Sequence, residues 1–271
     1  MDRYVVIGNP IAHSLSPDIH AGFAREMGER ISYERMLVPP GAFAAHANRF
    51  FKEGGLGANV TLPFKLDALR FADRASERAA LAGAANFLAK KSGRIEADNT
   101  DGLGLIADLT RNLGLKVRGT RILLLGAGGA ARGVLAPLLA ESPSRLVIAN
   151  RTPERARDLV QHFASRGPVE GTALDRIPDD RFDLVLNATS ASTRGEPLVL
   201  PDHALTSGAF AYDMAYGPAG RGFLERARAR GMQASDGLGM LVEQAAESFH
   251  LWRGRRPQTR AVLAELRARV A

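Results

Sequence analysis

The segment GANVTLPFK, residues 57–65, places a lysine where a helix is expected to begin. A strand pattern ends in a Thr-Leu-Pro turn, and proline suits a helix start because its missing N–H would have no partner there. Lysine does not suit it, because the positive end of the helix dipole favours anions. Such local conflicts mark candidate functional residues. Lys65 is therefore the first candidate for chemistry, as an amine that can release and regain a proton.

Further polar clusters follow the other strand patterns of the same half. After YVVIG, Ser14 and Ser16 precede a helix pattern, and they either bind a carboxylate or cap that helix. After GRIEADN, Asp101 stands at a helix start, as a functional carboxylate or as a cap. Asn86 in GAANFLAK is either an edge or turn residue or a ligand contact. Thr61, in the TLPFK turn, is a further polar residue at a strand end.

A polar residue also interrupts the last apolar helix pattern, DGLGMLVEQAAESFHLW. Gln244 shares one predicted helix face with Leu241, Ser248 and Leu251. Because a buried amide needs a partner, Gln244 either makes a structural hydrogen bond or contacts a ligand. The lysine, aspartate, amides and hydroxyls together suit a polyhydroxylated, carboxylated small molecule. The sequence carries no zinc-binding pattern, so a carbonyl reduction here is expected to be metal-independent.

The segment GAGGAA, residues 126–131, follows the strand pattern RILLL and opens the helix GAARGVLAPLLA. This is the context that a dinucleotide-binding loop requires, although a strand–helix turn without a ligand is the alternative. Gly126 permits the tight turn, Gly128 lets a pyrophosphate approach the backbone, and Ala131 fills the close-packed third position. The candidate cofactor contacts of this loop are Gly126, Ala127, Gly128, Gly129 and Ala130.

The next strand pattern indicates which dinucleotide binds. NAD-preferring units usually carry an acidic residue there, to hold the ribose 2′-hydroxyl. Here RLVIAN ends in Asn150, Arg151 and Thr152, with Arg155 one helical turn later. Guanidinium groups bind phosphate bidentately, so the pattern favours NADP over NAD. The alternative is that Thr152 caps a helix and the arginines are solvated.

Strand and helix patterns alternate throughout the 271 residues, which predicts an α/β fold with mostly parallel sheets in two domains. Residues 1–103, completed by 237–271, form the expected substrate domain, and 104–236 a Rossmann-type NADP-binding domain, with a hinge near 101–118. A helix is expected from Gly102 to Leu113. The final helices, near 238–252 and 258–270, are expected to pack back on the first domain and leave a ligand cleft between two lobes.

Charge and composition limit the classes of binding partner that the protein is expected to have. The net charge is +7, but arginines are interleaved with acidic residues and no nucleic-acid module signature appears, so a small-molecule ligand is expected rather than nucleic acid. No apolar run reaches the ~20 residues that span a bilayer. The sequence has no cysteine and no signal-peptide pattern, which predicts a cytoplasmic protein. A monomer and a homodimer are both compatible with the sequence.

The motifs GNPIAHSLSP, GANVTLPFK, AGAAN, DNTDG, GAGGAAR, NRT, NATS, YDMAY and DGLGMLVEQAA occur in this order between about residues 5 and 252. In order and spacing the set resembles the NADP-dependent class of shikimate dehydrogenase. The resemblance implies the reversible reduction of 3-dehydroshikimate to shikimate, with NADPH, on the route to aromatic amino acids.

The resemblance also implies roles for individual residues. Lys65 would be the catalytic lysine and pair with Asp101. Ser14 and Ser16 would bind the substrate carboxylate. The ring hydroxyls would be held by Thr61, Asn86, Asp101 and Gln244, with Tyr216 near the substrate. Met214 and Gly237 would lie near the nicotinamide, and the adenosine phosphate end would be bound by Asn150, Arg151, Thr152 and Arg155.

Two positions depart from the pattern of relatives. Ser192 in NATSAS stands where relatives often have glycine, and Ala85 in AGAAN stands where valine is common. Two rival functions are considered. One is a quinate/shikimate dehydrogenase of broader substrate range that would accept NAD, and an acidic residue after RLVIAN would favour it. The other is a non-catalytic dinucleotide sensor, against which Lys65 and Asp101 argue.

Overall fold

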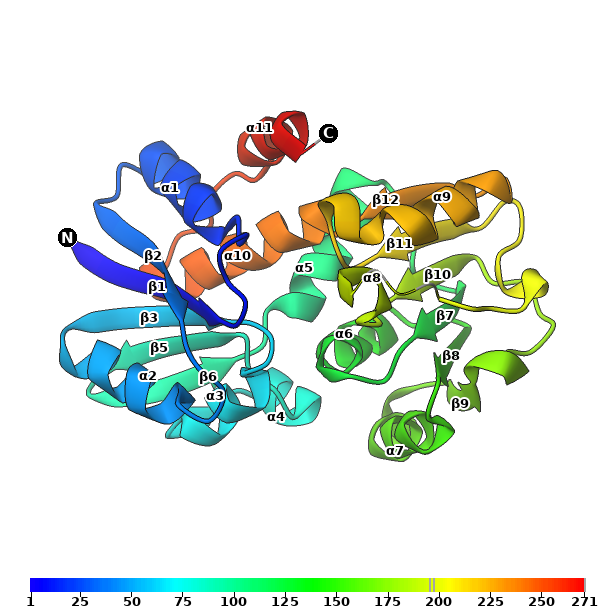
Figure 1. The fold of residues 1–271 in the computed structure, drawn as a ribbon, viewed down its shortest axis with the longest axis horizontal. Helices are drawn as coiled ribbons and strands as arrows, with labels where there is room; N and C mark the ends of the chain where they lie inside the picture. The colour runs from blue at the N-terminus through cyan, green and yellow to red at the C-terminus, as the bar shows by residue number, and fades with distance from the viewer. Residues whose placement is uncertain (195, 197, 271) are drawn as a thin grey trace. The chain divides into compact units, whose positions relative to one another are not determined.

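The apolar runs of the sequence form strands and the amphipathic stretches between them form helices, as Figure 1 shows. The structure is a computed structural model that describes residues 1–194, 196 and 198–270. The chain divides into two units. The first consists of Met1–Gly104 with Leu241–Arg269, and the second essentially of Leu105–Met240. The predicted α/β class with parallel-rich sheets is confirmed, and the last helices belong to the first unit.

The first unit is built on a six-stranded sheet of order β2-β1-β3-β5-β6-β4. Its strands are β1 (Asp2–Gly8), β2 (Ile31–Leu37), β3 (Gly55–Val60), β4 (Arg74–Ala75), β5 (Phe87–Lys91) and β6 (Arg94–Asp98). Only β5 runs against its neighbours β3 and β6; the other pairs are parallel. Since β1 and β3 are parallel, with Ile7 beside Val60, their carboxyl ends meet at one edge of the sheet.

Helices cover both faces of this sheet. They are α1 (Ser16–Met27), α2 (Phe43–Lys52), α3 (Lys65–Phe71), α4 (Glu77–Ala82), α10 (Leu238–Arg253) and α11 (Arg260–Val270). In Figure 1, α2, α3 and α4 lie below the sheet, and α1, α10 and α11 lie above it. The sheet admits α10 closely because Gly57 has no side chain: a Cβ there would lie 2.2 Å from Nε1 of Trp252. That indole N–H donates to the Leu88 carbonyl at 3.0 Å.

A buried histidine of α1 packs against the sheet of this unit. The His20 ring stacks on Tyr33 with ring centroids 4.1 Å apart and lies 5.4 Å from Trp252. Among the described residues its ring nitrogens have no hydrogen-bond partner of ordinary geometry. Burial lowers the pKa of His20 to about 3, against a smaller opposing effect of the Asn59 amide. His20 is therefore a neutral, apolar-like member of the core.

The second unit is a doubly wound sheet of six parallel strands, ordered β12-β11-β10-β7-β8-β9. Its strands are β7 (Arg121–Leu125), β8 (Arg145–Asn150), β9 (Val169–Ala173), β10 (Leu184–Asn187), β11 (Phe210–Asp213) and β12 (Gln233–Asp236). Its helices are α5 (Asp101–Ala107, which begins in the first unit), α6 (Gly129–Ala140), α7 (Pro153–Phe163), α8 (Ala191–Arg194) and α9 (Arg221–Ala229). The strands RILLL and LVLN are almost entirely buried, as expected for a parallel sheet covered on both faces.

The helix predicted from Gly102 to Leu113 is only partly α-helical. After α5, residues Asp108–Asn112 form a π-helix, in which the Leu113 N–H donates to the Asp108 carbonyl. The buried Asp108 carboxylate accepts from the Tyr212 hydroxyl at 2.6 Å. Burial and this carboxylate raise the pKa of Tyr212. Sequence periodicity could not predict the wider turn, because it coincides with a contact to a residue about a hundred positions away.

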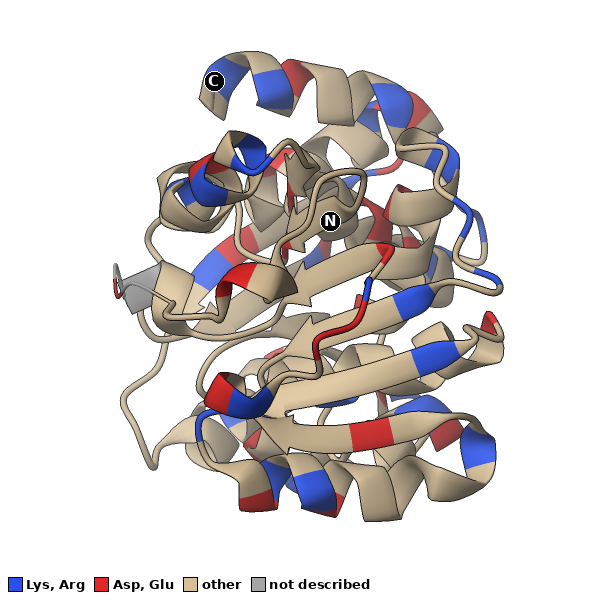
Figure 2. Cartoon of the chain, turned by 90° about the vertical axis from the view of Figure 1, so that its right-hand side faces the viewer, with Lys and Arg blue, Asp and Glu red and all other residues tan. Residues whose placement is uncertain are grey.

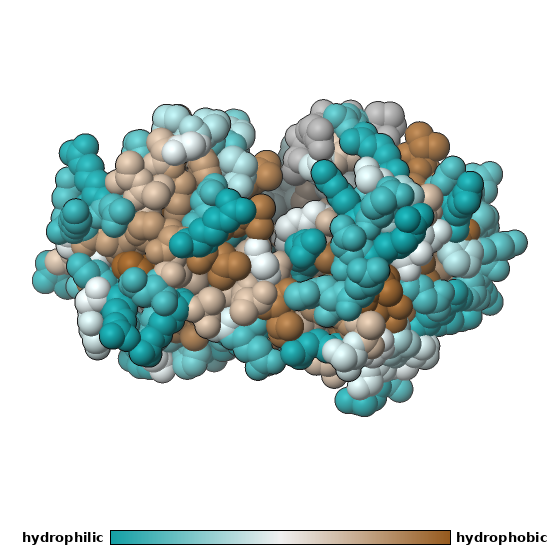
Figure 3. Space-filling model, turned by 90° about the horizontal axis from the view of Figure 1, so that it is seen from below, coloured by the Kyte–Doolittle hydropathy of each residue, from teal (hydrophilic) through white to brown (hydrophobic). Residues whose placement is uncertain are grey.

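The surface mixes charges and apolar groups. In Figure 2, basic and acidic residues are intermixed over the helices, and the face in Figure 3 carries apolar side chains among hydrophilic ones. Large apolar side chains are exposed at Met1, Leu37, Leu62, Leu66 and Val199. Within the described part of the chain, every helix is too short or too polar to cross a membrane.

The buried histidine predicts an acid sensitivity. In the unfolded chain the ordinary pKa of histidine is about 6.5, so the unfolded state takes up a proton well before His20 does in the fold. Protonation of the unfolded chain therefore lowers the free energy of unfolding as the pH falls from 6.5 towards 3. Between pH 7 and pH 5 this loss amounts to about 2 kcal/mol of unfolding free energy. Replacing His20→Phe should remove this part of the pH dependence.

Urea unfolding at the two pH values measures this difference. Fluorescence of Trp252, the single tryptophan, reports on the unit that contains His20. The matched control is His13→Gln, because the His13 side chain is exposed. If His20→Phe and the wild-type protein lost the same free energy of unfolding between pH 7 and pH 5, the assignment of His20 as buried and neutral would be wrong.

Candidate active site

Lys65 is the first residue of α3, the helix start that the sequence predicts. Phe64 occupies the N-cap position and offers no side-chain cap. The Lys65 Nζ donates to Asp101 Oδ2 at 2.5 Å. The side chain of Lys65 is 22% exposed and that of Asp101 only 8%, so the ion pair is screened from water on most sides. The structure thus brings together the two residues expected to move a proton.

Asp101 begins α5 but does not use its carboxylate as a helix cap. Its second oxygen, Oδ1, accepts from Asn86 Nδ2 at 2.8 Å. The Asp101 N–H instead donates to Asn99 Oδ1 at 3.1 Å. The interpretation of Asp101 as a cap is therefore wrong, because both of its oxygens are engaged by Lys65 and Asn86.

A second carboxylate, that of Asp98, anchors the chain segment that leads to Asp101. Asp98, at the end of β6, accepts from Ser76 Oγ at 2.5 Å and from Arg78 Nη2 at 2.6 Å and Nε at 3.1 Å. It also accepts from the Asn99 N–H at 2.7 Å. Since Ser76 and Arg78 lie at the start of α4, this cluster ties the turn after β6 to a helix. Such support fixes a functional side chain in one geometry.

Asn86 lies in a buried amide network. It is 3% exposed and directly precedes β5, so it is not an edge residue. Its Nδ2 lies within hydrogen-bond distance of Asp101 Oδ1, of Thr100 Oγ1 at 2.9 Å and of Gln244 Oε1 at 3.2 Å. Gln244 donates from Nε2 to the Leu241 carbonyl at 2.8 Å. The structural hydrogen bond considered for Gln244 is thus present, and its ligand contact stays a prediction.

Asn59 and Tyr33 of this network were missed from the sequence, and Ser248 was placed on the Gln244 helix face without a role. Asn59 in β3 accepts from the Tyr33 hydroxyl at 2.8 Å and donates to Ser248 Oγ at 2.9 Å. Ser248 also lies 3.4 Å from Thr100 Oγ1, which joins Asn59 to the Asn86 network. Burial raises the pKa of the Tyr33 phenol, so it stays a hydrogen-bond donor. The signal for Asn59 was its amide within the apolar strand GANV, since a buried amide requires partners.

The serine pair lies in the turn before α1. Ser14 Oγ lies 3.2 Å from Ser16 Oγ and accepts the Ser16 N–H at 3.3 Å, while Leu15 occupies the N-cap position without a side-chain cap. Arg35 donates to the Ser14 carbonyl from Nε at 3.0 Å and Nη2 at 2.6 Å, which brings a positive charge to this turn. Thr61 follows β3, with its N–H on the Ile7 carbonyl at 2.9 Å.

The glycine-rich loop of the second unit has the form that a pyrophosphate needs. Gly126 has a φ of +105°, and a Cβ there would lie 3.1 Å from the Ala188 carbonyl. Gly128 is the N-cap of α6 and Gly129 its first residue, and a Cβ on either meets no atom within 4 Å. Ala131 is fully buried, as its packing position requires. The open helix N-terminus fits the diphosphate of a dinucleotide.

Asn150, at the end of β8, supports this loop. Its Oδ1 accepts the Ala127 N–H at 3.2 Å, and its Nδ2 donates to the Thr152 carbonyl at 2.8 Å. Thr152 is the N-cap of α7, as considered from the sequence, but its side chain makes no capping bond. Asn150 therefore shapes the loop through its own amide, and its contact with a cofactor stays a prediction.

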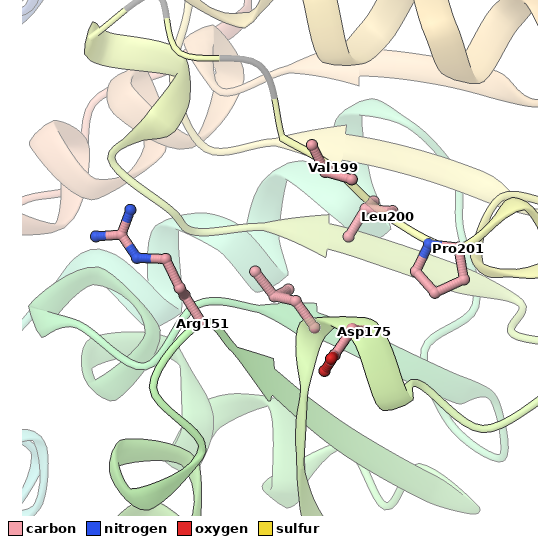
Figure 4. Close-up of a pocket in the computed structure, with 6 residues that line it drawn as sticks. Arg151, Asp175, Val199, Leu200 and Pro201 are labelled. Atoms are coloured by element: carbon pink, nitrogen blue, oxygen red, sulfur yellow. The ribbon is translucent and has the colours of Figure 1, made fainter.

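Two exposed guanidinium groups follow β8. Among the described residues, Arg151 and Arg155 form no ion pair, whereas Arg157 on the same helix pairs with Glu154 at 3.2 Å. Arg151 stands at one end of a cavity of about 470 Å³, and its guanidinium points away from Asp175 (Figure 4). The cavity is lined by Arg151, Leu174, Asp175, Val199, Leu200 and Pro201. Guanidinium groups without an acidic partner in the described chain fit the phosphate of NADP.

The remaining predicted residues also have defined places. Met214 and Gly237 are in backbone contact, because a Cβ on Gly237 would lie 2.3 Å from the Met214 carbonyl oxygen. Tyr216 belongs to the second unit and stands before Gly217; its substrate contact stays a prediction. Ala85 is fully buried, and its N–H donates to the Lys65 carbonyl at 2.8 Å. Among the described residues, no three acidic or histidine side chains gather as metal ligands would.

Comparison with known proteins agrees with this geometry. Family models match the chain at residues 6–88 (shikimate dehydrogenase substrate binding domain), 108–201 (shikimate / quinate 5-dehydrogenase) and 237–267 (shikimate 5'-dehydrogenase C-terminal domain). The chain is 53% identical over 274 residues to the shikimate dehydrogenase (NADP(+)) of Acidovorax sp. strain JS42, covering 100% of this chain and 97% of that protein.

Two solved structures are similar along the whole chain. One is an Ael1 enzyme from Pseudomonas putida, 48% identical, with a TM-score of 0.92 and 98% of each chain covered. The other is shikimate 5-dehydrogenase from Thermus thermophilus in complex with NADP(H) and shikimate, 32% identical, with a TM-score of 0.86 and 100% of each chain covered. The resemblance inferred from the motifs is confirmed. The chain belongs to the shikimate dehydrogenase family.

Proposed function

We propose that this chain catalyses the reversible, NADP-dependent reduction of 3-dehydroshikimate to shikimate. The observation that carries the proposal is the screened Lys65–Asp101 pair, with Nζ and Oδ2 2.5 Å apart. A proton donor held in this way is what a metal-independent carbonyl reduction needs. Arg151 and Arg155, which follow β8 and pair with no described acidic residue, support NADP as the cofactor. The chain would act in the cytoplasm, on the route to aromatic amino acids.

The cofactor is assigned to the second unit. The N–H groups at the start of α6, with Gly126, Ala127, Gly128, Gly129 and Ala130, would hold the diphosphate. Arg151 and Arg155, with Asn150 and Thr152, would take the 2′-phosphate. Met214 and Gly237 would flank the nicotinamide. When bound, the cofactor supplies the hydride for the carbonyl carbon.

The proton is assigned to Lys65. As negative charge develops on the carbonyl oxygen, the Lys65 ammonium donates a proton to that oxygen, and in the reverse direction the neutral amine accepts it. Asp101 orients Nζ through Oδ2, and Asn86 holds Oδ1 of the same carboxylate. Because Nζ and Oδ2 lie 2.5 Å apart, lysine and aspartate are proposed to act as one unit.

The substrate is assigned to the first unit, and the contact of Tyr216 with it stays what the family resemblance implies. Ser14 and Ser16 would bind the carboxylate, with the Arg35 guanidinium stabilising the negative charge nearby. Thr61, Asn86, Asp101 and Gln244 would hold the ring hydroxyls. The substrate domain is proposed as residues 1–103 and 237–271 and the NADP domain as 104–236.

Wild-type turnover of shikimate with NADP, followed at the nicotinamide absorbance, tests the reaction, and parallel arms test the rivals. Quinate turned over as well as shikimate, or NAD used as well as NADP, would favour the broader quinate/shikimate dehydrogenase. Binding of NADP without any turnover would favour the dinucleotide sensor.

Lys65→Met should lower kcat by at least about a hundredfold, because positioned proton transfer contributes about 10²–10⁴ in rate. NADPH should still bind, since the proposed cofactor contacts lie in the other unit. Steady-state kinetics and NADPH fluorescence measure the two effects. Lys52→Met, on the exposed surface of α2, is the control and should match the wild-type protein. Near-normal turnover by Lys65→Met would remove the lysine from the mechanism.

Arg151→Ala should raise KM for NADPH far more than KM for NADH, because only NADPH carries the 2′-phosphate. A lost charge-assisted bidentate contact corresponds to about 10- to 100-fold. Arg157→Ala is the matched control on α7, since Arg157 already pairs with Glu154. Equal effects of Arg151→Ala on the two cofactors would refute the phosphate role.

A further inference from the structure

Ser192 is bound to a buried carboxylate of the second unit. In α8 its Oγ donates to Asp213 Oδ2 at 2.7 Å. Asn187 Nδ2 lies 2.8 Å from the same oxygen and 3.0 Å from Ser192 Oγ. Asn187 and Asp213 are fully buried and Ser192 is 9% exposed. Asn187 and Asp213 are register partners at the carboxyl ends of β10 and β11, the sheet edge where parallel α/β folds bind ligands.

The Asp213 carboxylate depends on neutral donors. Among the described residues no cation pairs with it, and burial raises its pKa. Hydrogen bonds from Ser192, from the Ala215 N–H and from Asn187 lower the pKa of Asp213, and the one from Ser192 does so most. The Asp236 carboxylate adds a smaller repulsion. A buried charge without a counter-ion is costly unless its hydrogen bonds are complete, so the loss of one donor has a large effect.

This carboxylate organises two loops. On the β11 side, Asp213 Oδ1 accepts the Ala215 N–H at 2.8 Å, and the Met214 N–H donates to the Asn187 carbonyl at 2.9 Å. On the β10 side, Asn187 Oδ1 accepts the N–H and the hydroxyl of Thr189 at 3.1 and 2.8 Å. Ser192 thus ties the start of α8 to the turn that carries Met214.

We propose that Ser192 is a positioning residue for the nicotinamide end of the cofactor site. Its hydroxyl fastens the loop after β10 to Asp213 and so fixes the backbone of Met214 and Ala215. Glycine or alanine at position 192 has no hydroxyl and leaves Asp213 one donor short. This inference rests on the proposed function, in which the Met214 turn lies beside the nicotinamide.

Ser192→Ala should weaken NADPH binding about 5- to 10-fold, less than the full effect of one lost hydrogen bond to a charged group, because Ser192 acts on the cofactor only through the Met214 turn. The Kd is measured by NADPH fluorescence, and the Kd for shikimate should stay within about twofold. The control is Ser165→Ala, whose hydroxyl is exposed in the same unit. A purely structural role would lower Tm without changing the Kd for NADPH, and that result would overturn the proposal.

Two further variants test the route through Asp213. Ser192→Thr keeps the hydroxyl and should bind NADPH better than Ser192→Ala. In the Asp213→Asn background, Ser192→Ala should add little to the Kd, because the charge that it serves is gone. If the two substitutions instead raised the Kd for NADPH by independent factors that multiply, coupling through Asp213 would be contradicted. If the wild-type protein turns over shikimate while Ser192→Ala binds NADPH normally, only this inference fails; if the wild-type protein binds no NADPH, the proposed function fails with it.

Discussion

The Lys65 amine, held 2.5 Å from a nearly buried carboxylate, makes the interaction on which the proposed chemistry of the first unit depends. An ion pair screened from water must be fully hydrogen-bonded, since burying a charge costs more than a surface pair returns. The structure meets this requirement at both oxygens of the Asp101 carboxylate. Lys65 engages one oxygen of Asp101, and Asn86 engages the other.

Support for this pair comes from well outside it. Asp98, with Ser76 and Arg78, anchors the turn that leads to Asp101. The Asn86 amide is tied to Gln244 of α10, and Trp252 holds that helix against the sheet at Gly57. The return of α10 to the first unit therefore contributes to the candidate active site, because it supplies Gln244 and Ser248 to the polar network.

Local signals predicted the α/β architecture, the glycine-rich loop and the helix start at Lys65. These features follow from hydrophobic period, turn chemistry and the helix dipole, which act over a few residues. The network around Asn59, Tyr33 and Ser248 was not predicted. The Asn59 to Ser248 bond joins residues 189 positions apart, and only the folded sheet and helix bring them together.

The same limit applies to the capping role considered as an alternative for Asp101 and to the π-helix at Asp108. A carboxylate at a helix start caps the helix unless a tertiary partner takes it, and here Lys65 and Asn86 do so. At Asp108 the Tyr212 hydroxyl is the distant partner. The sequence shows Ser192 as a departure from relatives, but only the fold shows that its hydroxyl bonds to Asp213.

The central claim is that Lys65 and Asp101 act as one proton-transfer unit. A double-mutant cycle on kcat for shikimate oxidation, with Lys65→Met, Asp101→Asn and the double variant, tests it most directly. The account predicts that the double variant is about as slow as Lys65→Met alone, because residues that act as a unit are not additive. If instead the two losses multiplied, Lys65 and Asp101 would act independently and the account would be contradicted.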